Sequence, residues 1–107
     1  MATIFRGKPD PELLQVQRAM ERFEADHPGA HADLYRQNSV SIRVRVLSDH
    51  FRAMTRADRH DEVWKYLESL DSRILEQISV LLPLAAGEKQ RSMANMDFED
   101  PLPSAIG

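Results

Sequence analysis

The segment VSIRVRV, from Val40 to Val46, carries the clearest structural signal in the chain. Aliphatic side chains alternate strictly with polar ones, and a period of two is typical of a β-strand that buries one face. The side chains that we expect on the buried face are Val40, Ile42, Val44 and Val46. The opposite face then carries Arg43 and Arg45, with Arg36 from a neighbouring strand. Such arginines either hold phosphate groups or form a solvated sheet surface, and we favour the solvated surface.

The residues before this segment indicate a partner strand. Ala32 and Leu34 alternate with more polar residues, and residues 37–39 have the turn-forming sequence Gln-Asn-Ser. A short connection between two strands predicts an antiparallel hairpin.

Two amphipathic helices flank the hairpin. Asp10 followed by Pro11 is an N-cap with proline at the first helical position, and an apolar stripe continues to about His27. After the hairpin, Ser48 caps a short helical turn and Thr55 caps a second helix. The apolar stripe of this second helix is expected at His60, Val63, Trp64, Leu67 and Leu70.

The C-terminal third is expected to begin with another strand. Ile74, Ile78, Val80 and Leu82 predict this strand, which Pro83 closes. Beyond it, an apolar group formed by Met93, Met96 and Phe98 either folds back on the domain or docks into a partner, and we favour folding back.

These elements predict an α+β domain with the order α-β-β-α-α-β and a short C-terminal helix or tail. Helices are expected to cover one face of a three-stranded mixed sheet. We expect an N-terminal arm at residues 1–9, the domain at 10–88 and a tail at 89–107.

The composition limits the possible functions. The chain has 107 residues, a formal net charge of −3 and no cysteine. Such a length holds one domain with a modest core, and the negative charge disfavours indiscriminate nucleic-acid binding. The absence of thiols excludes disulfides and thiolate metal sites supplied by this chain. No segment resembles a membrane span or an export signal, so we expect a cytoplasmic protein without membrane contact, monomeric or weakly dimeric.

Several polar residues have the chemistry of an active site but a better structural explanation. The run SDH at residues 48–50 holds the residue types of a catalytic triad, yet adjacent side chains in a turn point in different directions, which favours helix capping. His27 and His31 have the spacing of two helical metal ligands, but Pro28-Gly29 ends the helix between them. His60 is interpreted as a helix-packing residue. We predict no catalytic residue and no metal site, and expect the protein not to be an enzyme.

A longer pattern links the second strand to the second helix. Val46, Ser48, Asp49 and Phe51 are followed, eight positions after the phenylalanine, by Arg59-His60 and then by Val63 and Leu67. This pattern resembles the signature of BolA-like proteins. Leu75 to Val80 is similar to the final strand of that family, and Leu84 to Glu88 resembles its closing motif L-T-P-x-E. The resemblance spans about Leu13 to Glu88 and implies a fold similar to a type II KH domain.

The resemblance implies a non-enzymatic adaptor or regulator. BolA-like proteins pair with monothiol glutaredoxins around a shared iron–sulfur cluster, and some are described as DNA-binding regulators. By position, Phe51 anchors the turn, and Arg59 and His60 form the polar signature of the helix.

Three positions depart from the family, among them Ser41, where the family sometimes has a histidine. Glu76 replaces a strand histidine that can ligate iron, so we expect it to contact a partner and predict no resident cofactor. Ala53 replaces a glycine that supplies either a positive φ or room for close approach. The alternative function is a KH-like nucleic-acid-binding regulator that uses Arg43, Arg45 and the helix-turn-helix.

Overall fold

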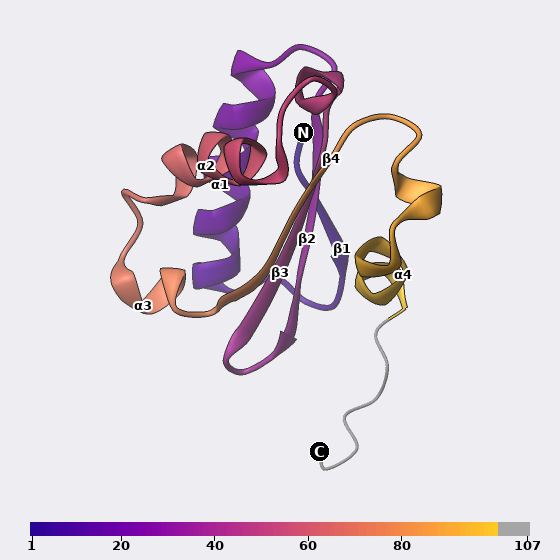
Figure 1. Ribbon diagram of the computed structural model, residues 1–107. Coiled ribbons are helices and arrows are strands. Elements are labelled where there is room, and N and C mark those ends of the chain that lie inside the picture. The colour runs from indigo at the N-terminus through magenta and orange to yellow at the C-terminus, as the bar shows by residue number, and fades with distance from the viewer. Residues whose placement is uncertain (101–107) are drawn as a thin grey trace.

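The computed structural model describes residues 1–100 (Figure 1). Four strands form one sheet: β1 (Thr3–Arg6), β2 (His31–Asn38), β3 (Ser41–Leu47) and β4 (Ile78–Leu84). The α-helices are α1 (Pro11–Asp26), α2 (Arg56–Leu67), α3 (Ser72–Leu75) and α4 (Met93–Glu99). The described residues also include two 3-10 turns, η1 (Asp49–Phe51) and η2 (Lys89–Arg91). None of the helices in the described part combines the length and hydrophobicity needed to cross a membrane.

The capping residues begin the helices as the sequence predicts. The Asp10 carboxylate accepts a hydrogen bond from the backbone N–H of Leu13, and Pro11 is the first residue of α1. The Thr55 hydroxyl accepts one from the N–H of Asp58 and begins α2. These contacts satisfy N–H groups that have no partner inside a helix.

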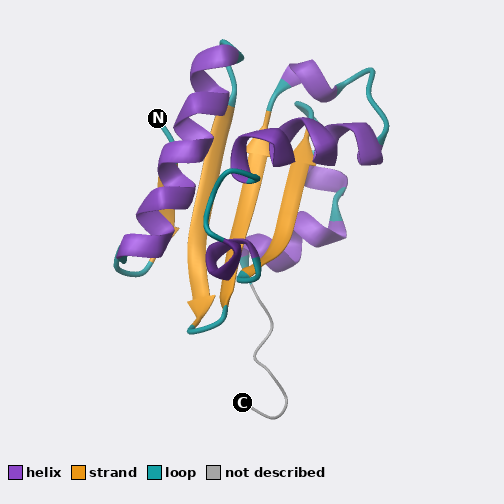
Figure 2. Cartoon of the chain, turned by 90° about the vertical axis from the view of Figure 1, so that its left-hand side faces the viewer, coloured by secondary structure: helices purple, strands orange, loops and turns teal. Residues whose placement is uncertain are grey.

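The main core lies between the sheet and the two long helices. Ile42, Val44 and Val46 of β3 are fully buried and pack in one cluster with Leu13 and Phe23 of α1 and other apolar residues. Figure 2 shows that α1 runs roughly along the strands, whereas α2 lies across them. The burial of each large apolar side chain contributes about 1.5–3 kcal/mol, so this face provides most of the stability.

The α+β class is confirmed, but the prediction of three strands is wrong. Residues 3–6, expected in an N-terminal arm, form β1, which pairs in parallel with β2. The sheet order is β1-β2-β3-β4, with β2 and β3 antiparallel and β3 and β4 parallel. The strand formed by residues 3–6 has only four residues, too few for a convincing periodic pattern.

The prediction that helices cover only one face is also wrong. α1 and α2 lie on one side of the sheet, and α4 lies on the other (Figure 1). Phe98 of α4 is fully buried and contacts Phe5 and Tyr35, whose ring centroids are 5.6 and 5.0 Å away. Folding back is therefore confirmed for Phe98, whereas Met93 and Met96 are exposed. Residues 101–107 of the predicted tail lie outside the described residues.

Three predictions at strand ends also need correction. Ile74, expected in the last strand, lies in α3, and β4 begins at Ile78. Val40 belongs to the hairpin turn and is 70% exposed, because β3 begins one residue later. β4 continues through Pro83 to Leu84 instead of closing at the proline. β4 is an edge strand with a single neighbour, and an edge strand tolerates a residue without an N–H.

Candidate functional site

Phe51 lies in the core at the junction of three elements. The Ser48 hydroxyl accepts a hydrogen bond of 3.2 Å from the N–H of His50, which confirms its capping role before η1. The Phe51 ring is fully buried, 5.8 Å from the ring of Phe23 in α1. The structure therefore places Phe51 inside the domain, where it anchors the turn between β3 and α2.

Arg59 and Glu88 form a paired contact between α2 and the segment after β4. The Arg59 guanidinium donates to both carboxylate oxygens of Glu88, at 2.5 and 3.0 Å, and to the carbonyl of Met54 at 3.1 Å. Glu88 also accepts from the N–H of Ala85. The hydrogen bond from Arg59, followed by that from Ala85, lowers the pKa of Glu88 to about 2. This pair ties α2 to the segment that follows β4.

His60 is exposed, so its predicted place on the buried stripe of α2 is wrong. The buried positions of this helix are Arg59, Val63 and Leu67, spaced by four residues. The His60 ring instead stacks on Trp64, with centroids 5.8 Å apart and an interplanar angle of 16°. Arg59 takes the buried position because Glu88 neutralises its charge.

A cleft lies between α2, β4 and the start of α4, and we call it the α2–β4 cleft. The lining residues important here are Arg56, His60, Leu82, Pro83, Arg91 and Met93. Met93 is 84% exposed, and among residues 1–100 no strand pairs with the outer side of β4. Within residues 1–100, Arg56 and Arg91 make no ion pair with an acidic side chain. The cleft combines apolar side chains, a free strand edge and two positive charges.

The arginine face of the sheet is covered by α4, so the predicted solvated surface is wrong. Arg45 is only 2% exposed and donates to Asp33 at 2.6 Å and to Asn95 at 2.7 Å. It also pairs with Glu99, and this hydrogen bond lowers the pKa of Glu99. Arg43 pairs with Asp97 at 2.8 Å. The acidic residues of α4 therefore neutralise both arginines. Arg36, predicted on this same face, lies opposite Ile42 on the helix-covered face and pairs with Asp10, so that prediction is wrong.

Glu76 and Ala53 are both exposed. Glu76 follows α3, and its side chain makes no hydrogen bond or ion pair to the rest of residues 1–100. Ala53 shows no strain, because no non-glycine residue in the described part has a positive φ. The alanine in place of the family's glycine is thus compatible with this backbone.

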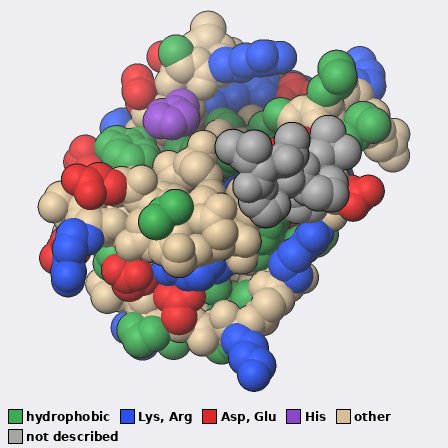
Figure 3. Space-filling view, turned by 90° about the horizontal axis from the view of Figure 1, so that it is seen from below, with side chains coloured by type: hydrophobic (Ala, Val, Ile, Leu, Met, Phe, Trp, Pro, Cys, Tyr) green, Lys and Arg blue, Asp and Glu red, His purple; other side chains and the backbone are tan. Residues whose placement is uncertain are grey.

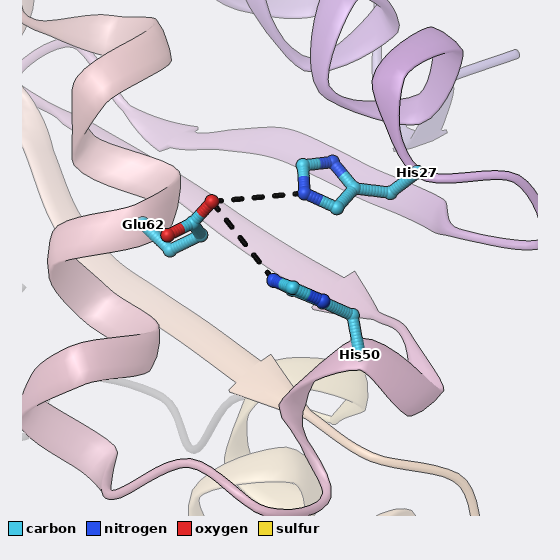
Figure 4. A group of neighbouring side chains, drawn as sticks. All are labelled: His27, His50 and Glu62. Carbon is cyan, nitrogen blue, oxygen red and sulfur yellow. Dashed lines mark ion pairs between the residues drawn. The ribbon is translucent and has the colours of Figure 1, made fainter.

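Three potential metal ligands converge where α1, η1 and α2 meet (Figure 4). Glu62 Oε1 lies 3.7 Å from His27 Nε2 and 3.9 Å from His50 Nε2. The spacing of His27 and His31 was the metal-ligand pattern rejected from the sequence, and in the structure His31 contacts Asp33. Residues 27, 50 and 62 do not have the spacing of a metal-binding sequence motif. The group therefore becomes apparent only in the folded structure.

Comparisons with known proteins identify no relative. The sequence matches no protein-family model, and neither curated proteins nor solved structures give a significant match.

Proposed function

We propose that the chain is a non-enzymatic adaptor of the BolA-like type that acts through protein–protein contact at the α2–β4 cleft. The expected partner is a monothiol glutaredoxin, as the sequence resemblance implies. The proposal rests on where the structure places the residues that resemble the BolA-like signature. Arg59, His60 and Glu88, which come from two separate parts of the pattern, all line this one cleft.

The roles of these residues support the same proposal. Phe51 and the Arg59–Glu88 pair are architectural: they fix α2 against the segment that follows β4. His60 is exposed beside them and is free to contact a partner. An adaptor binds a partner without catalysing a reaction. Buried residues that hold α2 in place, with an exposed histidine beside them, suit this role.

The cleft also indicates the chemistry of the partner segment. The outer edge of β4 accepts an extended segment through backbone hydrogen bonds only before Pro83, because the proline has no N–H and its carbonyl oxygen accepts from Arg59 at 3.4 Å. Leu82 and Met93 offer apolar contacts, and Arg56 and Arg91 favour acidic side chains. The partner segment is therefore expected to be extended, apolar at its centre and acidic at its flanks.

The arginine face provides no support for the alternative of nucleic-acid binding. Arg43 and Arg45 have carboxylate partners from α4, so they offer few free donors to phosphate groups. In Figure 3, acidic and basic side chains are interspersed over the face seen from below. A phosphate backbone favours a concentrated positive surface over such a mixture.

The proposal is tested by isothermal titration calorimetry of the full chain with a monothiol glutaredoxin, both apo and loaded with its cluster. We expect Met93→Asp to weaken binding at least tenfold, equivalent to about 1.4 kcal/mol. Met96→Asp is the matched control, since Met96 is an exposed methionine of the same helix outside the lining of the cleft. No binding at about 1 mM, or equal losses in the two variants, would overturn the proposal.

A further inference from the structure

We propose that His27, His50 and Glu62 form a binding site for a divalent transition-metal ion of the zinc type. This site lies at the junction of α1, η1 and α2 and uses none of the residues assigned above to the proposed partner contact. The inference therefore does not depend on the proposed function.

The three side chains point to a common centre from three elements (Figure 4). His27 lies at the C-terminal end of α1, His50 in η1 and Glu62 in the middle of α2. Their ligand atoms all lie within 4.8 Å of one another, and no hydrogen bond joins these side chains in residues 1–100. Three ligand atoms that converge without bonding each other leave a position between them that suits a cation.

His27 is held in the orientation and tautomer that a metal ligand requires. Its Nδ1 lies 2.9 Å from the backbone carbonyl oxygen of Phe23, which can only accept, so Nδ1 carries the proton. In the neutral ring, Nε2 then has a free lone pair directed toward Glu62. The ring also stacks on Phe23, with centroids 4.0 Å apart and an interplanar angle of 17°, and its side chain is only 13% exposed. A carbonyl partner on the second ring nitrogen is the usual support of a metal-bound histidine.

The distances fit a small tetrahedral ion. Bonds of about 2.0–2.1 Å to zinc place the ligand atoms of a tetrahedron about 3.3 Å apart. The separations from Glu62 Oε1 to the two histidines are 3.7 and 3.9 Å, and the two histidine ligand atoms lie within 4.8 Å of one another. Closure therefore needs shifts of about half an ångström at Glu62 and of up to about 1.5 Å between the histidines. His50 is 46% exposed and Glu62 27%, which leaves both side chains free to make this adjustment.

The ligand set selects the class of ion. Two imidazoles and one carboxylate suit zinc and its neighbours among the divalent transition metals, whereas magnesium and calcium prefer oxygen ligands alone. The absence of cysteine excludes the thiolate ligation typical of most iron–sulfur clusters. Three protein ligands leave a fourth position for water or for a donor atom of another molecule. A surface depression lined by His27 and His50 adjoins the site.

The surroundings of the cluster leave the metal-facing side unobstructed. Lys65 Nζ lies 3.7 Å from Oε2 of Glu62, the carboxylate oxygen away from the histidines, and its side chain is largely exposed. Tyr66 packs edge-on to the His27 ring, and its hydroxyl donates to Asp26. Both groups therefore keep their contacts when an ion occupies the centre.

The test is titration of the full chain with Zn²⁺ by calorimetry, together with the visible spectrum of the Co²⁺ form, whose intensity reports tetrahedral coordination. We expect one equivalent of metal to bind, and expect Glu62→Gln and His50→Ala each to weaken binding at least tenfold. His60→Ala, which removes an exposed histidine of α2 outside the cluster, should leave the affinity unchanged. Circular dichroism of each variant separates loss of the site from loss of the fold.

Thermal unfolding gives a second readout. A ligand present at a hundred times its dissociation constant raises the melting temperature of a domain of this size by about 10 °C or more. We expect this rise for the wild type and for His60→Ala but not for Glu62→Gln. Binding weaker than about 1 mM, or equal zinc affinity in the wild type, His50→Ala and Glu62→Gln, would overturn the proposal.

Discussion

The Arg59–Glu88 pair gives the most quantitative prediction of the structure. Glu88→Gln removes the carboxylate charge while keeping the shape of the side chain. The lowering of the Glu88 pKa from 4.5 to about 2 corresponds to about 3 kcal/mol of stabilisation at neutral pH. Because Glu88 is 29% exposed, solvent screening reduces this contribution to roughly 2 kcal/mol.

The sign of the pH dependence follows from the direction of the shift. A carboxyl whose folded pKa is depressed contributes its full stabilisation above the unfolded pKa and loses it as the pH falls through the folded pKa. The difference between the wild type and Glu88→Gln should therefore be constant above about pH 5 and shrink steadily between pH 4.5 and about 2.

The assay is urea unfolding at several pH values, followed by the fluorescence of Trp64, which is partly buried against the core. Asp49→Asn is the matched control, because Asp49 pairs with Arg52 at 2.8 Å while both side chains are largely exposed. This control should lose no more than about 0.5–1 kcal/mol. A stability of Glu88→Gln equal to that of the wild type at pH 7, or a difference that does not shrink in acid, would refute the reasoning.

Three further predictions concern the strands and the helix that covers them. Val44→Ala should cost about 2 kcal/mol in urea unfolding, whereas Val40→Ala should stay within about 0.5 kcal/mol, and equal costs would contradict the register of β3. The hydrogen bond to Asp26 raises the pKa of Tyr66 to about 12, so Asp26→Asn should return it toward 10 in a titration of phenolate absorbance, and an unchanged titration would argue against that bond. Phe98→Ala should cost about 3 kcal/mol and speed amide exchange in α4, and a neutral effect would mean that α4 does not cover the sheet.

Much of the fold could be predicted because its signals are local. The alternation that ends at Val46, the cap formed by Asp10 with Pro11 and the cap at Thr55 each depend on residues close in sequence. Local patterns say which side chains share a face, but they do not say what covers that face. The alternation predicts that Arg45 lies opposite the aliphatic face of β3, and this is confirmed. Its burial depends on α4, whose Asn95 follows it by 50 residues in the sequence.

A signal for this helix was present in the sequence. Asn95, Phe98 and Glu99 have the i, i+3, i+4 spacing of one helical face, and their chemistry complements an arginine. By contrast, the group of His27, His50 and Glu62 gives no pattern at all, because its members come from three elements that meet only in the folded chain.

The most direct test of the proposed function is nuclear magnetic resonance of the ¹⁵N-labelled chain titrated with an unlabelled monothiol glutaredoxin. We expect the largest shifts at the backbone amides of His60, Leu82 and Met93, which line the α2–β4 cleft. The amides of Arg18 on α1 and Ser39 in the hairpin turn, both exposed and outside the cleft lining, should stay in place. A spectrum that does not change, or shifts confined to α1 and the hairpin, would contradict the account.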